Sequence, residues 1–154
     1  MISSRKEARD REFSSIPVGD KVSFTRMITQ DNVNLFAALT EDFNPLHVDE
    51  EYAMHTQFGG RVAHGMLAGS LFSTLVGMHL PGKKCLYLSQ TLQFKSPVRM
   101  GEEILIHGEV IGKIDALRIL VIHTKIINDK KEILIDGEAK VKVLDGEKVQ
   151  PPFS

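Results

Sequence analysis

The sequence predicts a single domain of the α+β class, in which an antiparallel sheet wraps around a long central apolar helix. The stretch from Val62 to Gly82 contains no charged residue, and the segment His64–Met78 within it has the composition of a helix that is apolar nearly all round. Four extended segments with alternating apolar and polar residues follow between positions 86 and 143. One helix that can cover a sheet, followed by strands joined by short turns, gives this arrangement.

Composition and charge indicate an ordinary globular domain. The chain has 154 residues, of which 42% are hydrophobic and 25% charged, with a formal net charge of −1. Basic and acidic residues are interspersed, so we expect no one-sided basic surface for nucleic acid. Cys85 is the only cysteine, which excludes an intramolecular disulfide and a cysteine metal cluster and favours a cytoplasmic location.

We expect three parts: a solvated N-terminal segment at 1–13, one domain at 14–147 and a C-terminal tail at 148–154. The first segment interleaves basic and acidic residues and lacks the apolar core of a secretory signal. Its acidic residues also disfavour a transit peptide. We therefore interpret it as a lead-in to the domain.

The first elements are a strand and a helix. Alternation at about 21–28 weakly indicates a strand, and Thr29 or Asp31 can cap the helix that follows. Apolar residues then recur with helical spacing at Val33, Phe36, Ala37 and Leu39. We expect Asn44-Pro45 to end this helix, because the residue before a proline avoids the α region.

A second short helix and the central helix come next. Asp49 can cap the short helix, and Gly59-Gly60 closes that segment. Polar residues interrupt the apolar run at His64, Ser70, Ser73, Thr74 and His79, so burial in a protein core is favoured over a membrane span. Each glycine costs roughly 1 kcal/mol relative to alanine in a helix, so sheet or ligand must approach closely at Gly65, Gly69 and Gly77.

The second half reads as strands. Apolar residues alternate from Leu86 to Phe94, at 104–110, at 119–127 and most regularly at 133–143. Short turns between these segments predict a four-stranded antiparallel meander. The edge strands of such a sheet would be exposed, and pairing two copies of the chain is a common remedy.

One polar pair points to chemistry. Asp42 and His47 lie five residues apart, with Pro45 holding the backbone between them out of a helix. Near neutral pH an aspartate is ionised and a histidine exchanges its proton, so the two could move water or a proton onto a substrate. Which of the two takes which proton stays open.

These residues resemble a known family. Residues 36–47 resemble the hydratase motif of the MaoC-like (R)-specific enoyl-CoA hydratases, and 61–66 resemble the segment that opens their central helix. Residues 86–98, with the turn at Gly101-Glu102, look like the strand that follows. The likeness spans roughly 18–144 and is greatest to the short, single-domain hydratases associated with polyhydroxyalkanoate precursor supply.

The resemblance implies a hot-dog fold, a homodimer, and reversible addition of water to trans-2-enoyl-CoA to give (R)-3-hydroxyacyl-CoA in fatty acid metabolism. It implies that Asp42 and His47 hold and activate the water, that the Gly65 backbone N–H polarises the thioester carbonyl, and that Ser73 faces the site. Asn44 and Met66 of the same motifs are expected to bind the substrate. No metal, redox cofactor, nucleic acid or membrane is required. Glu41, where many members carry glycine, is a mild variation.

Each assignment has a structural alternative. Asp42 and Asn44 could only cap and turn the backbone before Pro45. Gly65 could only permit close packing, and Ser73 could bond back to its own helix. Other residues read as structural or as solvated: His64 at the helix start, Cys85 as a small strand hydrophobe, His55, His79, His107 and His123 without ligand spacing, and Lys140 and Lys142 on the wet face of a strand.

Other functions also stay open. The same site would serve a 3-hydroxyacyl-acyl-carrier-protein dehydratase, with an acyl carrier protein as partner. The chain could be a non-catalytic acyl-thioester-binding hot-dog protein, although the Asp–His pair argues against that. A thioesterase of the same fold is a further alternative. Acyl chain length cannot be read from the sequence.

Overall fold

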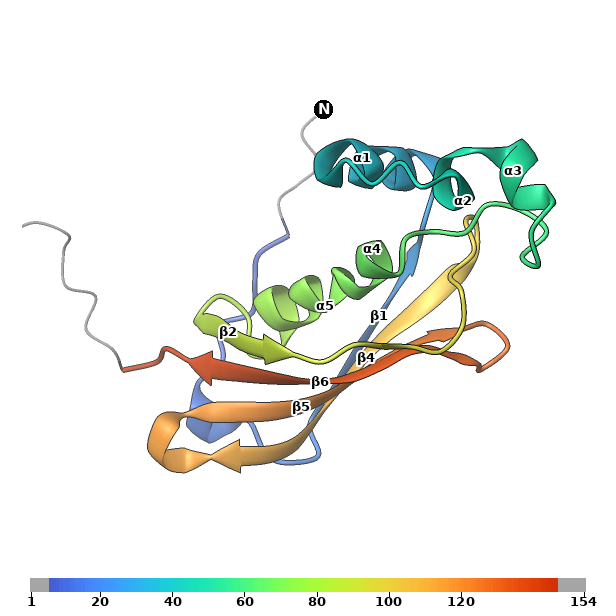
Figure 1. Cartoon of the computed structure of the whole chain (residues 1–154). Coiled ribbons are helices and arrows are strands. Elements are labelled where there is room, and N and C mark those ends of the chain that lie inside the picture. Colours follow the sequence, from blue (N-terminus) through green and yellow to red (C-terminus); the bar gives the residue numbers. More distant parts are fainter. Residues whose placement is uncertain (1–5, 147–154) are drawn as a thin grey trace, which may run out of the picture.

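The computed structural model describes residues 6–146, and these form an antiparallel sheet curved around a helical segment (Figure 1). The elements, in chain order, are η1 (Phe13–Ser15), β1 (Lys21–Met27), α1 (Gln30–Thr40), α2 (Pro45–Val48), α3 (Glu50–Met54), α4 (Gly65–Gly69), α5 (Leu71–Thr74), η2 (Leu75–His79), β2 (Cys85–Gln90), β3 (Gln93–Phe94), β4 (Glu103–Ile114), η3 (Asp115–Leu117), β5 (Ile119–Asn128) and β6 (Ile133–Val143). Figure 1 shows α1–α3 as a layer of their own, on the side of α4 and α5 away from the sheet. The α+β class is thus confirmed.

The strand order differs from the predicted meander. It runs β1-β4-β5-β6-β2, with β3 also paired to β6, so only the last three long strands form a meander. The long connection from β2 to β4 lets β2 cross to the far edge of the sheet, a non-local pairing that alternation alone does not reveal. Buried side chains of the meander face the helical segment, including Ile106, Ile122 and Val141. Ile133, expected to be buried, is partly exposed.

The central helix is divided into three short elements instead of running continuously as predicted. It begins at Gly65, but Ser70 separates α4 from α5, and the last turn is a π-helix. The Ser70 hydroxyl donates to the Leu67 carbonyl at 2.6 Å, a local bond that competes with the helical ladder. Burial is also one-sided: Phe72 and Leu75 lie in the core, whereas Met66, Ser70 and Ser73 are exposed.

Two of the three helical glycines allow the close approach that was expected. A Cβ built on Gly65 would lie 2.8 Å from Cδ1 of Phe94, and one on Gly69 would lie 3.2 Å from Cδ1 of Leu92. At Gly77 the sheet makes no such approach, because a Cβ there would meet no neighbouring atom of the described residues within 4 Å.

The segment before the site also differs from expectation. Thr29 caps α1 as predicted, but the helix ends at Thr40, four positions before Asn44. The Thr40 hydroxyl donates to the Phe36 carbonyl and accepts from the Asp42 N–H, and Glu41 takes a left-handed conformation with φ +60°. Pro45 begins α2 rather than ending α1, because its missing N–H costs nothing at a first helical position.

The short helix α3 and the N-terminal segment also differ in part from the prediction. Asp49 caps α3 as predicted, but this helix ends at Met54, before Gly59-Gly60. Residues 6–12 expose most side chains, yet their backbone is not free of the domain: Asp10 forms a β-bridge with Gly82, and Arg9 donates to the Met78 carbonyl. The predicted tail at 148–154 lies outside the described residues.

Candidate active site

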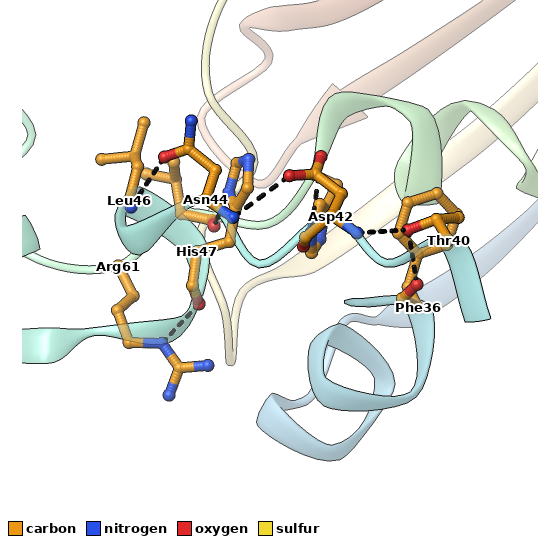
Figure 2. A network of polar contacts seen from close by, with 9 residues as sticks. Phe36, Thr40, Asp42, Asn44, Leu46, His47 and Arg61 are labelled. Carbon is orange, nitrogen blue, oxygen red and sulfur yellow. Dashed lines mark hydrogen bonds and ion pairs between the residues drawn. The ribbon is translucent and has the colours of Figure 1, made fainter. Parts of the chain in front are cut away.

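Asp42 lies on the short link between α1 and α2, and its side chain is 51% exposed. Its Oδ1 accepts the Asn44 N–H at 3.2 Å, and the Asn44 side chain in turn accepts the Leu46 N–H at 3.0 Å (Figure 2). The predicted turn-forming role of Asp42 and Asn44 is therefore present. This role engages Oδ1 alone; Oδ2 lies 3.9 Å from Nε2 of His64 and accepts no hydrogen bond from the described residues, so it can take a further hydrogen-bond partner.

His47 lies on α2 and is held in one orientation. Its Nδ1 lies 2.8 Å from the Val62 carbonyl oxygen, and because a carbonyl can only accept, Nδ1 carries the proton. The Arg61 Nε donates to the His47 carbonyl at 2.5 Å, and the Val62 N–H donates to the Leu46 carbonyl. In the neutral ring, Nε2 is then left with its lone pair, which is the form a general base needs.

His64, interpreted from the sequence as structural, lies in the same cluster. It is 2% exposed, and its Nε2 donates to the Asp42 carbonyl at 3.0 Å. Its ring centroid lies 4.0 Å from that of His47 and 4.9 Å from that of Phe36. The signal that could have revealed it is an imidazole at the edge of an apolar run, since a buried polar ring needs a partner.

Asp42, His47 and His64 each offer one ligand atom, and these atoms lie within 4.8 Å of one another. A carboxylate and two imidazoles so arranged can hold a water molecule for proton transfer. They are also the residues of the described part of the chain that could ligate a metal ion.

Gly65 directly follows His64 and begins α4, so no helical carbonyl can accept its N–H. It lines an open pocket of about 400 Å³ with Met66, Phe58, Phe94 and Val98 among its mostly apolar walls. Met66 is 57% exposed there. The arrangement brings together, at one end of the helical segment, the polar cluster, an apolar pocket and a backbone N–H with no partner among residues 6–146.

Ser73 stands apart from this cluster. It is an exposed residue of α5, two helical turns beyond Gly65, and its hydroxyl makes no hydrogen bond with residues 6–146. The alternative of a hydroxyl bonded back to its own helix therefore does not hold. Cys85 is half-buried on β2, and burial raises the pKa of its thiol, which suits a packing role rather than a nucleophile.

Comparison with known proteins identifies the family of the chain. Residues 13–131 match the model of the MaoC like domain. The chain is 42% identical over 129 residues to the (R)-specific enoyl-CoA hydratase of Aeromonas caviae, covering 84% of this chain and 96% of that protein. It is 36% identical over 138 residues to the mitochondrial 3-hydroxyacyl-[acyl-carrier-protein] dehydratase of Arabidopsis thaliana, covering 84% of this chain and 82% of that one.

A solved structure gives the same result for the fold. The (R)-hydratase from A. caviae involved in PHA biosynthesis superposes with a TM-score of 0.82 at 42% identity, covering 84% of this chain and 98% of that chain. Together with the sheet curved around α4 and α5, this confirms the hot-dog fold. The chain therefore belongs to the MaoC-like family, of which the (R)-specific enoyl-CoA hydratases are members.

Proposed function

We propose that this protein is a hydro-lyase that reversibly adds water to trans-2-enoyl-CoA to give (R)-3-hydroxyacyl-CoA. The observation that carries this proposal is the meeting of three groups at one end of α4: the Asp42 carboxylate, the His47 imidazole with its proton on Nδ1, and the N–H of Gly65. The identity to named hydratases over most of the chain supports it.

The geometry suggests roles for each group. Asp42 orients a water through Oδ2 of its carboxylate, and Nε2 of His47 accepts a proton from that water as the hydroxyl adds to C3. Negative charge then grows on the thioester oxygen, where the Gly65 N–H stabilises it, and loss of such a donor typically costs about 3–4 kcal/mol of barrier. The proton returns to C2, completing the addition. Asn44, Met66 and Ser73 are proposed to contact the substrate.

The reaction transfers no electrons, so it needs no redox group. We also propose that it needs no metal, because the Gly65 N–H can polarise the thioester carbonyl and His47 can take the proton of the water. Because Asp42, His47 and His64 could ligate a metal, this point has its own test. Full activity after exhaustive chelation supports the proposal. Loss on chelation that added metal restores would contradict it.

We also propose a homodimer. The edge strand β2 exposes Leu86 and Leu88, which are 50% and 47% accessible, and an exposed apolar edge favours pairing with a second copy. Light scattering across a dilution series tests the oligomeric state. A role in polyhydroxyalkanoate precursor supply and fatty acid metabolism, in the cytoplasm, is the proposed context.

The deciding experiment combines a rate with a stereochemical product. Purified protein is incubated with crotonyl-CoA, loss of the enone absorbance is followed, and the product is resolved by chiral chromatography. We expect saturable hydration giving the R enantiomer. Release of free CoA would instead indicate a thioesterase, and thermal stabilisation by the thioester without turnover would indicate a binding protein.

A carrier-protein substrate is the second candidate, because the chain is also 36% identical to an acyl-carrier-protein dehydratase. The same acyl group is offered on CoA and on acyl carrier protein in parallel assays. A higher kcat/KM for CoA thioesters supports the main proposal, and a higher value for the carrier-protein thioester supports the second.

A further inference from the structure

We infer that His64 is a positioning residue that fixes the Asp42 carboxylate relative to His47 and the Gly65 N–H. The inference rests on the proposed hydration function, and it assigns a task to a buried imidazole that the mechanism above does not use.

The link that carries Asp42 has little else to hold it. The Asp42 N–H reaches the Thr40 hydroxyl at 3.3 Å, and the Asp42 side chain accepts from the Asn44 N–H at 3.2 Å, both within two residues along the chain. The bond from His64 Nε2 to the Asp42 carbonyl, at 3.0 Å, joins residues 22 apart. Among the described residues it is the hydrogen bond that ties this link to another part of the fold.

His47 has a separate attachment. Its ring donates to the Val62 carbonyl, and its own carbonyl accepts from Arg61 Nε. The segment that holds it is fixed in turn by the bond from the Ala63 N–H to the Val98 carbonyl at 2.8 Å. His64 continues this segment, so the same short stretch anchors His47 through Val62 and Asp42 through His64.

The packing holds the His64 ring in place, with Nε2 also 3.9 Å from Oδ2 of the Asp42 carboxylate. The ring is 2% exposed and lies between the rings of His47 and Phe36, with centroids at 4.0 and 4.9 Å. Its Nδ1 is buried without a hydrogen-bond partner within residues 6–146. Because Gly65 is the next residue, any shift of His64 moves the oxyanion donor and Asp42 together.

Three substitutions at His64 separate positioning from packing. His64→Gln places an amide nitrogen near the position of Nε2, His64→Asn places one near Nδ1, and His64→Leu fills space without a donor. A misplacement of about 1 Å can cost about 100-fold in rate, so we expect His64→Leu and His64→Asn to lose on the order of 100-fold in kcat on crotonyl-CoA. We expect His64→Gln to retain kcat within about tenfold of wild type, and KM to change little in all three, because no binding contact is removed.

His79→Leu is the matched control, since it removes an imidazole from the other end of the helical segment, where His79 packs on Phe24. It should keep wild-type kcat. Equal losses in the Gln, Asn and Leu variants, or losses that follow thermal stability rather than the donor position, would overturn the inference.

A measurement independent of activity tests the same geometry. Long-range 15N–1H spectra of the imidazoles should show the proton of His64 on Nε2 and that of His47 on Nδ1. The opposite tautomer at His64 would overturn the positioning role even in an active enzyme. Correct tautomers in a protein that hydrates no enoyl-CoA would contradict the proposed function alone.

Discussion

The Nδ1 atom of His47 lies 2.8 Å from the carbonyl oxygen of Val62. This contact determines that Nδ1 carries the proton. The acceptor that orients the ring is a backbone carbonyl and not the Asp42 carboxylate. Asp42 is thereby released from orienting the ring, so its carboxylate can serve the water instead. The pair differs in this respect from a carboxylate and imidazole that bond to each other directly.

The first prediction distinguishes the two nitrogens of His47: Nε2 as the proton acceptor and Nδ1 as the atom that holds the ring against Val62. His47→Asn keeps a donor near the position of Nδ1 but removes Nε2, and Asp42→Asn keeps the shape of the carboxylate without its charge. General acid–base groups contribute about 100- to 10,000-fold, so each variant should lose kcat in that range with little change in thermal stability. Hydration of crotonyl-CoA measures kcat. Near-wild-type turnover in either variant would end the corresponding assignment.

The second prediction concerns the contact between Gly65 and Phe94. Gly65→Ala would place a methyl group 2.8 Å from the Phe94 ring, and such overpacking typically costs about 1–3 kcal/mol of unfolding free energy. Gly65→Ala combined with Phe94→Ala should be less destabilised than the sum of the two single changes. Gly77→Ala is the control, because its Cβ meets nothing within 4 Å among the described residues, and it should be neutral or stabilising. Urea denaturation distinguishes these cases, and a strictly additive double variant would contradict the contact.

The third prediction concerns Glu41, which holds φ +60° directly before Asp42. A side chain in this conformation costs about 1–2 kcal/mol, whereas glycine adopts it freely, so Glu41→Gly should raise the free energy of unfolding by about 1 kcal/mol. Glu41→Ala keeps the Cβ and should change stability by less than about 0.5 kcal/mol. Denaturant midpoints of the two variants test this, and equal values would show that the conformation carries no penalty.

The fourth prediction is a loss of stability in mild acid. Burial, followed by the charge of Arg9, lowers the pKa of His79 below 6.5; burial, followed by Lys125, lowers the pKa of His107 below the same value. The unfolded chain therefore takes up these protons first as the pH falls from about 7, and the free energy of unfolding declines until the folded-state pKa values are reached.

Replacing both His79 and His107 by glutamine removes this source of pH dependence. The free energy of unfolding of the double variant should change less between about pH 7 and about pH 5 than that of the wild type. Denaturation curves at several pH values give the comparison. An unchanged slope would mean that the two lowered pKa values do not govern acid stability.

Local side-chain bonding explains which elements could be predicted. Thr29 and Asp49 cap their helices through bonds to residues three positions ahead, so the sequence alone contains both partners. The end of α1 is not predictable from composition, because the Thr40 hydroxyl bonds the Phe36 carbonyl and the Asp42 N–H, and nothing in the sequence distinguishes it from an ordinary helical threonine.

Long-range pairing explains what could not be predicted. β2 pairs with β6 and not with β4. The alternation of apolar and polar residues within a segment does not determine which strand that segment pairs with. The same holds for His64, whose role the sequence does not predict because its partner Asp42 lies 22 residues away. The Asp42–His47 pair was found because both members belong to one short motif, whereas the third ring of the cluster comes from the segment that begins the helix.

The bridge between Asp10 and Gly82 bears on how this protein is best handled in the laboratory. A Cβ at position 82 would lie 1.9 Å from the Arg9 carbonyl oxygen, so the glycine leaves room for the segment around Arg9 and Asp10 to cross the loop after η2. Removing the residues ahead of Phe13, where the match to the MaoC like domain begins, would strip away this crossing and leave the loop uncovered. Affinity tags and fusion partners are therefore better attached ahead of the first residue than in place of the opening segment.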